Sequence, residues 1–98
     1  MRLPVILRPE AEEDVQANFE YLEHARPGIG KKFLARLREV LDRIESFPAL
    51  YGLVWQDVRA ARLKRFRYVV YYVLFDDRVE VLAVIHGSRD GSIWQSRV

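Results

Sequence analysis

The sequence predicts an α+β fold in which two helices pack on one face of a small, largely antiparallel sheet, in the order β-α-α-β-β-β. Two observations carry this prediction. The first half contains two apolar stripes with a helical period, and the second half contains β-branched and aromatic runs separated by short turns. A chain of 98 residues has room for one such unit, so we expect a single domain over residues 1–98.

The first strand is expected at "LPVIL", residues 3–7, where Pro4 favours an edge strand or a first strand position. A helix is expected to follow within residues 8–25. Pro9 suits the first helical turn, and the acidic residues after it favour the helix dipole. The apolar residues of this segment recur every three or four positions and mark one face of the helix: Ala11, Val15, Phe19 and Leu22.

The turn "RPGIG", residues 26–30, leads into a second helix, which Pro48 ends. The apolar stripe of this helix is the clearest pattern in the chain: Ile29, Phe33, Leu37, Val40, Leu41, Ile44 and Phe47. Two helices joined by a tight turn cannot bury both of their stripes against each other. We therefore expect a sheet to cover them.

The second half supplies that sheet. Residues 49–57 are expected to form an irregular connection, and residues 58–64 a strand. The run "FRYVVYYVLF", residues 66–75, is apolar on both faces and is expected to be the central strand. A turn at 76–78 then leads into the last strand, for which alternation predicts two faces. Val79, Val81, Ala83 and Ile85 are expected on one face, and Glu80, Leu82, Val84 and His86 on the other. A polar, glycine-broken tail follows.

Residues 59–67, "RAARLKRFR", contain five basic residues and no acidic one. The first fifty residues carry a net charge of −1 and the remainder a net charge of +3, so the strand-rich half is the basic half. This pattern is typical of a solvated edge strand, where charge discourages edge pairing, and also of a surface that binds phosphate or an acidic partner. Alternation places Arg62 and Lys64 on one face, Arg59 on the other, and Arg65 and Arg67 near the connection. The charges are therefore expected to cluster at one end of the sheet and to extend onto its helix-free face.

His86 ends an apolar strand, and Arg89 follows three residues later. A histidine in this position is often a packing or hydrogen-bonding residue. With arginines nearby it could instead serve in general acid–base cleavage of RNA. In that reaction the 2′-hydroxyl loses a proton, the 5′-oxygen gains one, and cations stabilise the charged phosphorane. No metal is needed for this chemistry.

Three tyrosines lie in the expected central strand, with Tyr71 on one face and Tyr68 and Tyr72 on the other. Core packing is expected for most of them, although a tyrosine that faces away from the helices could stack on a base. We expect Trp55 and Trp94 to cover the core.

Several function classes are excluded or disfavoured. The chain has no cysteine, which excludes disulfides, thiolate catalysis and cysteine-rich zinc sites. Its two histidines lie far apart without metal-ligand spacing, and no phosphate-binding loop is present, so neither a metal nor a cofactor is expected. The apolar run at the N-terminus is too short for a signal peptide or a membrane span. We expect a cytoplasmic protein without a membrane partner.

Four phrases of the sequence resemble, in their order and spacing, the toxins of the RelE/ParE superfamily, the toxin half of bacterial type II toxin–antitoxin pairs. These phrases are "LRPEAEEDVQANFEYL", "FLARLREVLDRIESFPALYG", "RLKRFRYVVYYVLFDDRVEVLAVIHGSRD" and the closing "WQSR". The resemblance covers nearly the whole chain, and the superfamily fold is the one predicted above.

The resemblance implies a toxin that arrests bacterial growth, and our first interpretation is the RelE-like one, ribosome-dependent cleavage of messenger RNA. RelE-like members use basic residues of the sheet and often a histidine or tyrosine near the C-terminus. On this interpretation His86 is the acid or base, and the phosphate ligands are Arg62, Arg65 and Arg89. The residues expected to contact nucleic acid or another target are Arg59, Lys64, Arg67 and Arg97.

The resemblance also implies alternatives. ParE-like members inhibit DNA gyrase by binding, without hydrolytic chemistry. The ribonucleases commonly carry a catalytic tyrosine near the end of the chain, whereas "GSRDGSIWQSRV" has none and offers Trp94. An inactive member, or a plain nucleic-acid-binding module, is a further alternative. Each toxin reading implies a cognate antitoxin, encoded by the adjacent gene, whose acidic amphipathic segment folds over the basic run to form a hetero-oligomer.

Overall fold

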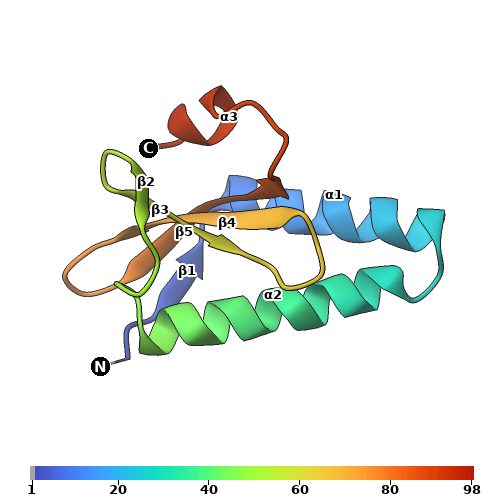
Figure 1. Ribbon diagram of the computed structural model, residues 1–98, viewed down its shortest axis with the longest axis horizontal. Helices are drawn as coiled ribbons and strands as arrows, with labels where there is room; N and C mark the ends of the chain where they lie inside the picture. The colour runs from blue at the N-terminus through green and yellow to red at the C-terminus, as the bar shows by residue number, and fades with distance from the viewer. Residues whose placement is uncertain (1) are drawn as a thin grey trace.

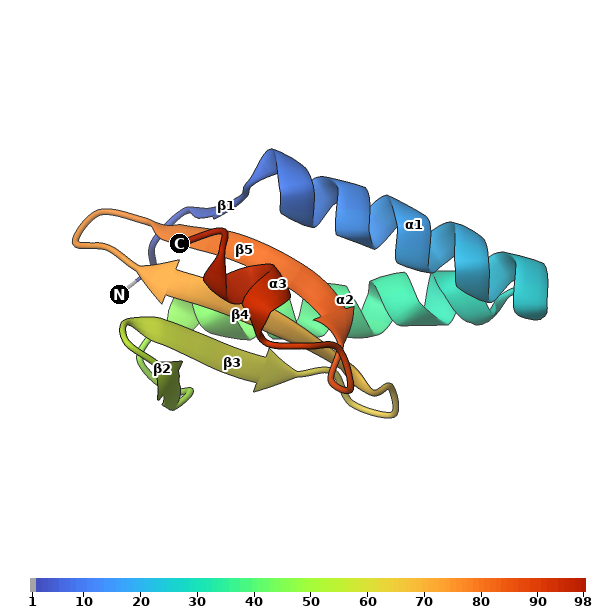
Figure 2. The ribbon, with the colours of Figure 1, turned by 90° about the horizontal axis from the view of Figure 1, so that it is seen from above.

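The computed structural model describes residues 2–98 and has two main layers, a five-stranded sheet and a helical hairpin on one of its faces (Figures 1 and 2). The strand order is β1-β5-β4-β3-β2, with β1 parallel to β5 and the other pairs antiparallel. The predicted fold class is confirmed. The elements are β1 Val5–Leu7, α1 Pro9–Ala25, α2 Ile29–Ser46, β2 Leu53–Trp55, β3 Val58–Arg62, β4 Tyr68–Leu74, β5 Val79–His86 and α3 Ser92–Gln95.

One carboxylate holds the α1–α2 turn. Glu23 Oε1 accepts backbone N–H bonds from Gly28 at 2.9 Å, Gly30 at 2.8 Å and Lys31 at 3.3 Å. These are N–H groups at the start of α2, which have no partner within the helix. The bond from Gly28, supported by those from Gly30 and Lys31, lowers the pKa of Glu23 against the opposing effect of desolvation. Gly28 has a φ of 92°, and a Cβ at position 30 would lie 2.6 Å from Glu23 Cγ, so both glycines are required here.

The prediction that β4 is central is confirmed, because six of its seven residues are buried. The strand sends alternate side chains to two separate cores. Tyr72, on the helix side, is fully buried, and its hydroxyl donates to the carbonyl of Pro48 at 2.7 Å. Burial raises the pKa of Tyr72 to about 12. The helix-side core joins the stripe of α2 to the sheet: Phe33, Leu37, Val40 and Ile44 pack with Ala61, Val70, Val79 and Val84.

The predicted alternation of β5 is wrong beyond Val81. The partner of Tyr71 is Ala83, whereas that of Tyr72 is Val81, so Leu82 is an extra residue in the ladder. Such a bulge reverses the alternation after it. Val79 and Val81 lie on the same face, as expected, and pack in the helix-side core. Ala83 and Ile85 were expected on that face too, but they pack on the opposite one. The bulge thereby turns His86 to the same face as Tyr68, its partner in β4.

Two further expectations are corrected. Residues 49–57 are not wholly irregular, because they contain β2, a three-residue edge strand paired with β3. The polar tail contains α3, a four-residue helix that lies over β4 and β5 on the face opposite to α1 and α2 (Figures 1 and 2). Trp94 of α3 is buried. The face expected to be free of helices is therefore partly covered by the end of the chain.

Candidate functional site

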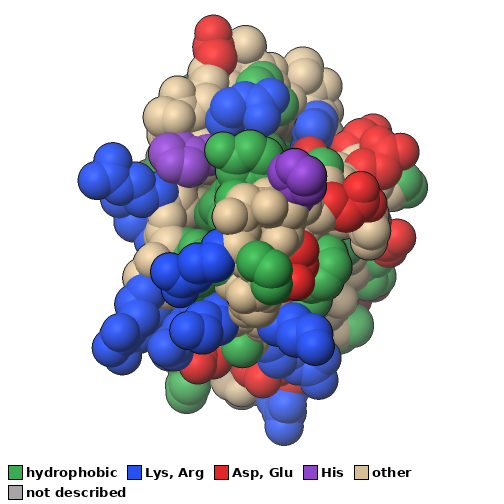
Figure 3. Space-filling model, turned by 90° about the vertical axis from the view of Figure 1, so that its right-hand side faces the viewer, with side chains coloured by type: hydrophobic (Ala, Val, Ile, Leu, Met, Phe, Trp, Pro, Cys, Tyr) green, Lys and Arg blue, Asp and Glu red, His purple; other side chains and the backbone are tan. Residues whose placement is uncertain are grey.

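Basic side chains gather at the end of the molecule that carries the α1–α2 turn and the β3–β4 turn. Figure 3 views this end and shows Lys and Arg side chains over its lower and left parts. Most of the acidic side chains visible in this view lie toward its right. The β3–β4 turn contains most of the basic run found in the sequence. The turn and Arg62 therefore lie at one end of the sheet, where the C-terminal end of β3 meets the start of β4 and the end of β5, whereas Arg59 pairs with Tyr72 farther along the sheet.

A cavity of about 410 Å³ opens at this end, lined by Arg62, Arg67, His86, Gly87 and Ser88. Arg62 ends β3, Arg67 directly precedes β4, and His86 ends β5. The backbone N–H of Gly87 donates to the carbonyl of Arg67 at 2.6 Å and fixes the two segments beside each other. Both arginines are exposed, and His86 is half-buried. The cavity is therefore lined by two basic residues and one histidine.

The imidazole of His86 is already hydrogen-bonded at Nδ1. The backbone N–H of Ser88 lies 3.1 Å from Nδ1, and the hydroxyl of Ser88 lies 2.7 Å from it. A backbone N–H can only donate, so Nδ1 is an acceptor and the ring proton is on Nε2. The imidazole and the ring of Tyr68 pack edge to face, with the ring centres 5.6 Å apart. Burial, with a contribution from Tyr21, raises the pKa of Tyr68 and keeps its phenol neutral.

This tautomer restricts what His86 can do. A general base at Nε2 would need the proton on Nδ1, where it would oppose the N–H of Ser88. In the observed arrangement Nε2 can donate a hydrogen bond to a phosphate or a carbonyl. The geometry thus suits binding better than proton abstraction.

The structure does not bring all the predicted catalytic residues together. Arg62 lines the His86 cavity, but Arg65 lines a separate groove between α2 and Phe66. Arg65 has a φ of 68°, a left-handed conformation that bulky residues seldom adopt, and this conformation belongs to the β3–β4 turn. Arg89 follows β5 in an exposed turn, where its backbone N–H donates to the carbonyl of His86 at 3.0 Å.

The residues predicted to contact a target are also divided. Lys64 is exposed in the β3–β4 turn, and Arg67 lines the His86 cavity. Arg59 lies on the helix side of β3 and donates to the carbonyl of Tyr51 at 2.6 Å, which holds the α2–β2 connection. Sequence reasoning placed Arg67 outside the catalytic set, although the Tyr68–His86 pairing brings it to the histidine. That pairing could have been inferred from the short turn between the two strands.

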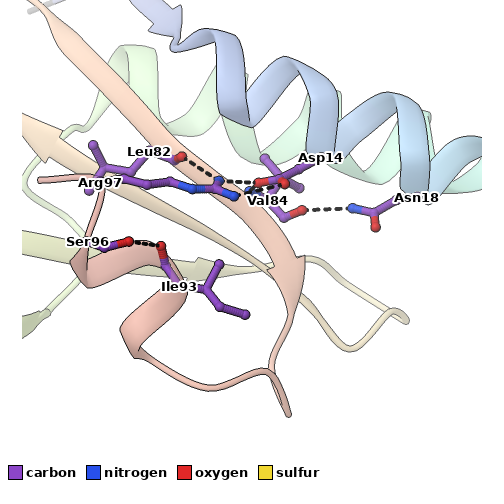
Figure 4. A network of polar contacts seen from close by, with 7 residues as sticks. All are labelled: Asp14, Asn18, Leu82, Val84, Ile93, Ser96 and Arg97. Atoms are coloured by element: carbon purple, nitrogen blue, oxygen red, sulfur yellow. Dashed lines mark hydrogen bonds and ion pairs between the residues drawn. The ribbon is translucent and has the colours of Figure 1, made fainter.

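Arg97 is part of an internal network (Figure 4). Its Nη1 lies 2.6 Å from Asp14 Oδ2 and 3.0 Å from the carbonyl of Leu82. Asp14 also accepts the N–H of Val84, and Asn18 donates to the carbonyl of Val84. These bonds provide partners for backbone N–H and C=O groups of β5 that lie beyond the end of β1, where no strand pairs with that edge. Arg97 thus attaches the end of the chain, and nothing in the sequence separation of Asp14 and Arg97 indicates this.

Tyr71 lies on the face opposite to Tyr68 and Tyr72, as expected. This face points away from the α1–α2 hairpin, but Tyr71 is covered there. Its ring stacks on that of Trp94 with centres 4.5 Å apart and planes 13° apart. Trp55 meets Trp94 edge to face at 5.9 Å. Both tryptophans therefore cover a core, as predicted, and it is the one on the sheet face opposite to the α1–α2 hairpin. Tyr71 is not available to stack on a base in this conformation.

Metal-binding clusters of three or more His, Cys, Asp or Glu side chains do not occur within residues 2–98. In the same part of the chain, no helix is both long enough and apolar enough to cross a membrane.

Comparison with known proteins identifies the family. A family model described as "ParE toxin of type II toxin-antitoxin system, parDE" matches residues 5–91. The protein named "Toxin ParE2" from Mycobacterium tuberculosis (strain H37Rv) is 27% identical over 88 residues, which cover 89% of this chain and 84% of that protein. The match to the family model ends at residue 91, before α3, so Trp94 and Arg97 lie outside it.

Solved structures share the fold. The structure titled "Chromosomal ParDE TA system from P. aeruginosa" superposes with a TM-score of 0.76 at 13% identity, covering 87% of this chain and 96% of that chain. The "YoeB-YefM complex from Staphylococcus aureus" superposes with a TM-score of 0.58 at 18% identity, covering 88% and 98%. Because the family model spans most of the sequence, this chain belongs to the ParE toxin family of type II toxin–antitoxin systems.

Proposed function

We propose that this chain arrests bacterial growth by binding DNA gyrase, without hydrolytic chemistry of its own. Gyrase inhibition is the activity that the resemblance to ParE-like toxins implies, and family membership favours it over the RelE-like activity. The sequence of the tail agrees, because it offers Trp94 where ribonuclease members commonly carry a tyrosine.

The observation that carries the proposal is the hydrogen bond to His86 Nδ1. The N–H of Ser88 makes Nδ1 an acceptor, so the ring lacks the free Nε2 lone pair that a general base requires. Arg65 also stands outside the cavity of His86. A set of residues that is divided between two cavities supports a binding surface better than a single catalytic centre.

Messenger RNA cleavage is the second candidate, and one observation favours it. Arg62, Arg67 and His86 line the same cavity, and arginines are residues that bind phosphate. On this account Arg67 takes the place that we assigned to Arg65 from the sequence.

The partner that we propose for either activity is a cognate antitoxin encoded by the adjacent gene. One similar structure is titled as a complex of YoeB with YefM, and another as a ParDE system. The exposed cations at the β3–β4 turn suit an acidic partner segment.

The proposal is tested with the purified chain in two parallel assays. One assay follows supercoiling of relaxed plasmid by gyrase, and the other follows messenger RNA in a cell-free translation reaction. We expect concentration-dependent inhibition of supercoiling with intact messenger RNA. Unaffected supercoiling at saturating protein, together with cleaved RNA, would establish the ribonuclease instead. Salt-sensitive nucleic-acid binding with neither effect would indicate a plain binding module.

A further inference from the structure

Exposed apolar side chains follow one another along one edge of the molecule. Eight large apolar side chains are exposed in residues 2–98, and four of these belong to the short segment that leads from the end of α2 into β2. They are Phe47 at 62%, Leu50 at 62%, Leu53 at 58% and Val54 at 53% exposure. The end of α2 lies opposite to the end of the molecule that carries the β3–β4 turn (Figure 1). We refer to these four side chains as the apolar edge.

The apolar edge is uncharged and held in place. Residues 46–56 form the longest stretch of the sequence without an acidic or basic side chain. Two arginines fix the segment through Tyr51. Arg43 of α2 donates to the hydroxyl of Tyr51 at 3.1 Å, and Arg59 of β3 donates to its carbonyl at 2.6 Å. A surface that is ordered before it binds loses little conformational entropy on association, and an uncharged surface does not repel a copy of itself.

The backbone of β2 is also open to a partner. The sheet ends at β2, and no strand of residues 2–98 pairs with its outer side (Figure 2). Leu53 is the partner of Arg59 in β3. The carbonyl of the preceding Gly52 accepts the N–H of Ala60 at 3.4 Å. Because the hydrogen-bonding groups alternate between the two sides of a strand, the N–H and C=O of Leu53 lie on the outer side.

These features fit a second copy of the chain. A two-fold axis beside Leu53 sets β2 of one protomer antiparallel to β2 of its partner, and the N–H of each Leu53 then donates to the carbonyl of the other. The same rotation brings Leu53 and Val54 next to their copies. Arg62, which lines a cavity with Leu53, belongs to β3 and stays one strand away from the axis. The four side chains of the apolar edge offer no cation to an acidic partner, so charge complementarity favours a copy.

We propose that the apolar edge is a contact between two copies of this chain, centred on Leu53. The contact goes beyond the proposed gyrase activity and does not depend on it. Four side chains that are about half exposed supply on the order of a few hundred Å² of apolar surface, whereas a standard interface buries about 800 Å² on each partner. We therefore expect a weak dimer, whose population rises with protein concentration.

Sedimentation equilibrium of the full-length chain, over a range of concentrations, measures the association. We expect reversible exchange between monomer and dimer in the wild type. Leu53→Glu places a carboxylate opposite its own copy and should weaken association at least about tenfold. The matched control is Tyr21→Glu, because Tyr21 is 69% exposed on α1, outside the apolar edge, and its replacement changes the net charge equally. The control should associate within about twofold of the wild type.

A mixture of opposite charges tests the two-fold contact itself. Leu53→Lys should be as monomeric as Leu53→Glu, but an equimolar mixture of the two should form a mixed dimer, which native mass spectrometry identifies. The absence of a mixed dimer would place the contact away from Leu53 and overturn the inference.

Two other results would also overturn it. One is a wild type that stays monomeric at every concentration, and the other is a dimer that Leu53→Glu leaves intact. If the wild type is a monomer and Leu53→Glu instead weakens inhibition of gyrase, or binding of the protein encoded by the adjacent gene, the apolar edge belongs to that partner and not to a second copy. The gyrase assay of the wild type tests the proposed function separately.

Discussion

The guanidinium of Arg97 and the carboxylate of Asp14 join the end of the chain to the first helix, with Nη1 2.6 Å from Oδ2. Their side chains are only 19% and 14% exposed, so water screens the pair weakly. Arg8 adds a hydrogen bond from its guanidinium to the carbonyl of Arg97. The pair holds α3 in place, and with it the tryptophan that covers Tyr71.

Replacing Arg97 by alanine should release the tail. We expect a loss of about 2–3 kcal/mol in the free energy of unfolding, because Asp14 loses its partner and Trp94 loses part of its burial. Denaturant unfolding measures the loss, and Trp94 fluorescence in a Trp55→Phe background reports opening of the tail. Arg97→Lys, which keeps the charge, should lose less. An alanine variant with wild-type stability and unchanged fluorescence would show that the pair does not hold the tail.

Glu23 should make folding sensitive to acid. Its pKa is lowered in the folded state, chiefly by the N–H of Gly28, so the stability it adds is present above the unfolded value. That stability is lost as pH falls through the folded-state pKa, when the protonated carboxyl can no longer accept three N–H groups as an anion. Glu23→Gln should be less stable than the wild type at neutral pH, and the difference should shrink as pH falls below about 4. A difference independent of pH would contradict this role.

Tyr72 should stabilise the fold through its hydrogen bond, and its raised pKa should make the fold less stable in alkali. Tyr72→Phe leaves the carbonyl of Pro48 without its donor and should cost about 1–2 kcal/mol in the free energy of unfolding. Because the folded-state pKa is raised to about 12, the wild type should lose stability as pH rises from about 10 towards that value. The phenylalanine variant should lack this step. Parallel alkaline dependence in both proteins would assign the step to another group.

The sequence was sufficient to predict the layers and the central strand, because those features follow from periodicity. The run from Tyr68 to Leu74 is apolar at every position, and only a strand covered on both faces accommodates that pattern. The bulge at Leu82 was not predictable, since one extra residue leaves composition unchanged and yet reverses the side chains that follow. β2 was missed because a three-residue edge strand carries too little alternation to be recognised.

The sequence indicated which residues to consider for the candidate site, but it did not indicate which of them lie together. The basic run and His86 do meet at one end of the sheet, as strand pairing requires. The separation of Arg65 from His86 depends on the left-handed backbone of the β3–β4 turn, which alternation cannot predict because it holds only within strands. Arg97 was expected to contact nucleic acid or another target, and its partner Asp14, 83 positions away in the sequence, was not foreseen.

The central claim is that toxicity does not need proton transfer by His86, and the variant His86→Asn addresses it most directly. The Asn side-chain oxygen can take the place of Nδ1 and accept the N–H of Ser88, while Nε2 is removed. Wild type and variant are expressed in a pulse in a bacterial host, and RNA integrity and plasmid supercoiling are followed in the same cultures. We predict growth arrest, relaxed plasmid and intact RNA with both proteins. Rapid loss of messenger RNA with the wild type, abolished in the variant, would contradict the account and identify His86 as a catalytic residue.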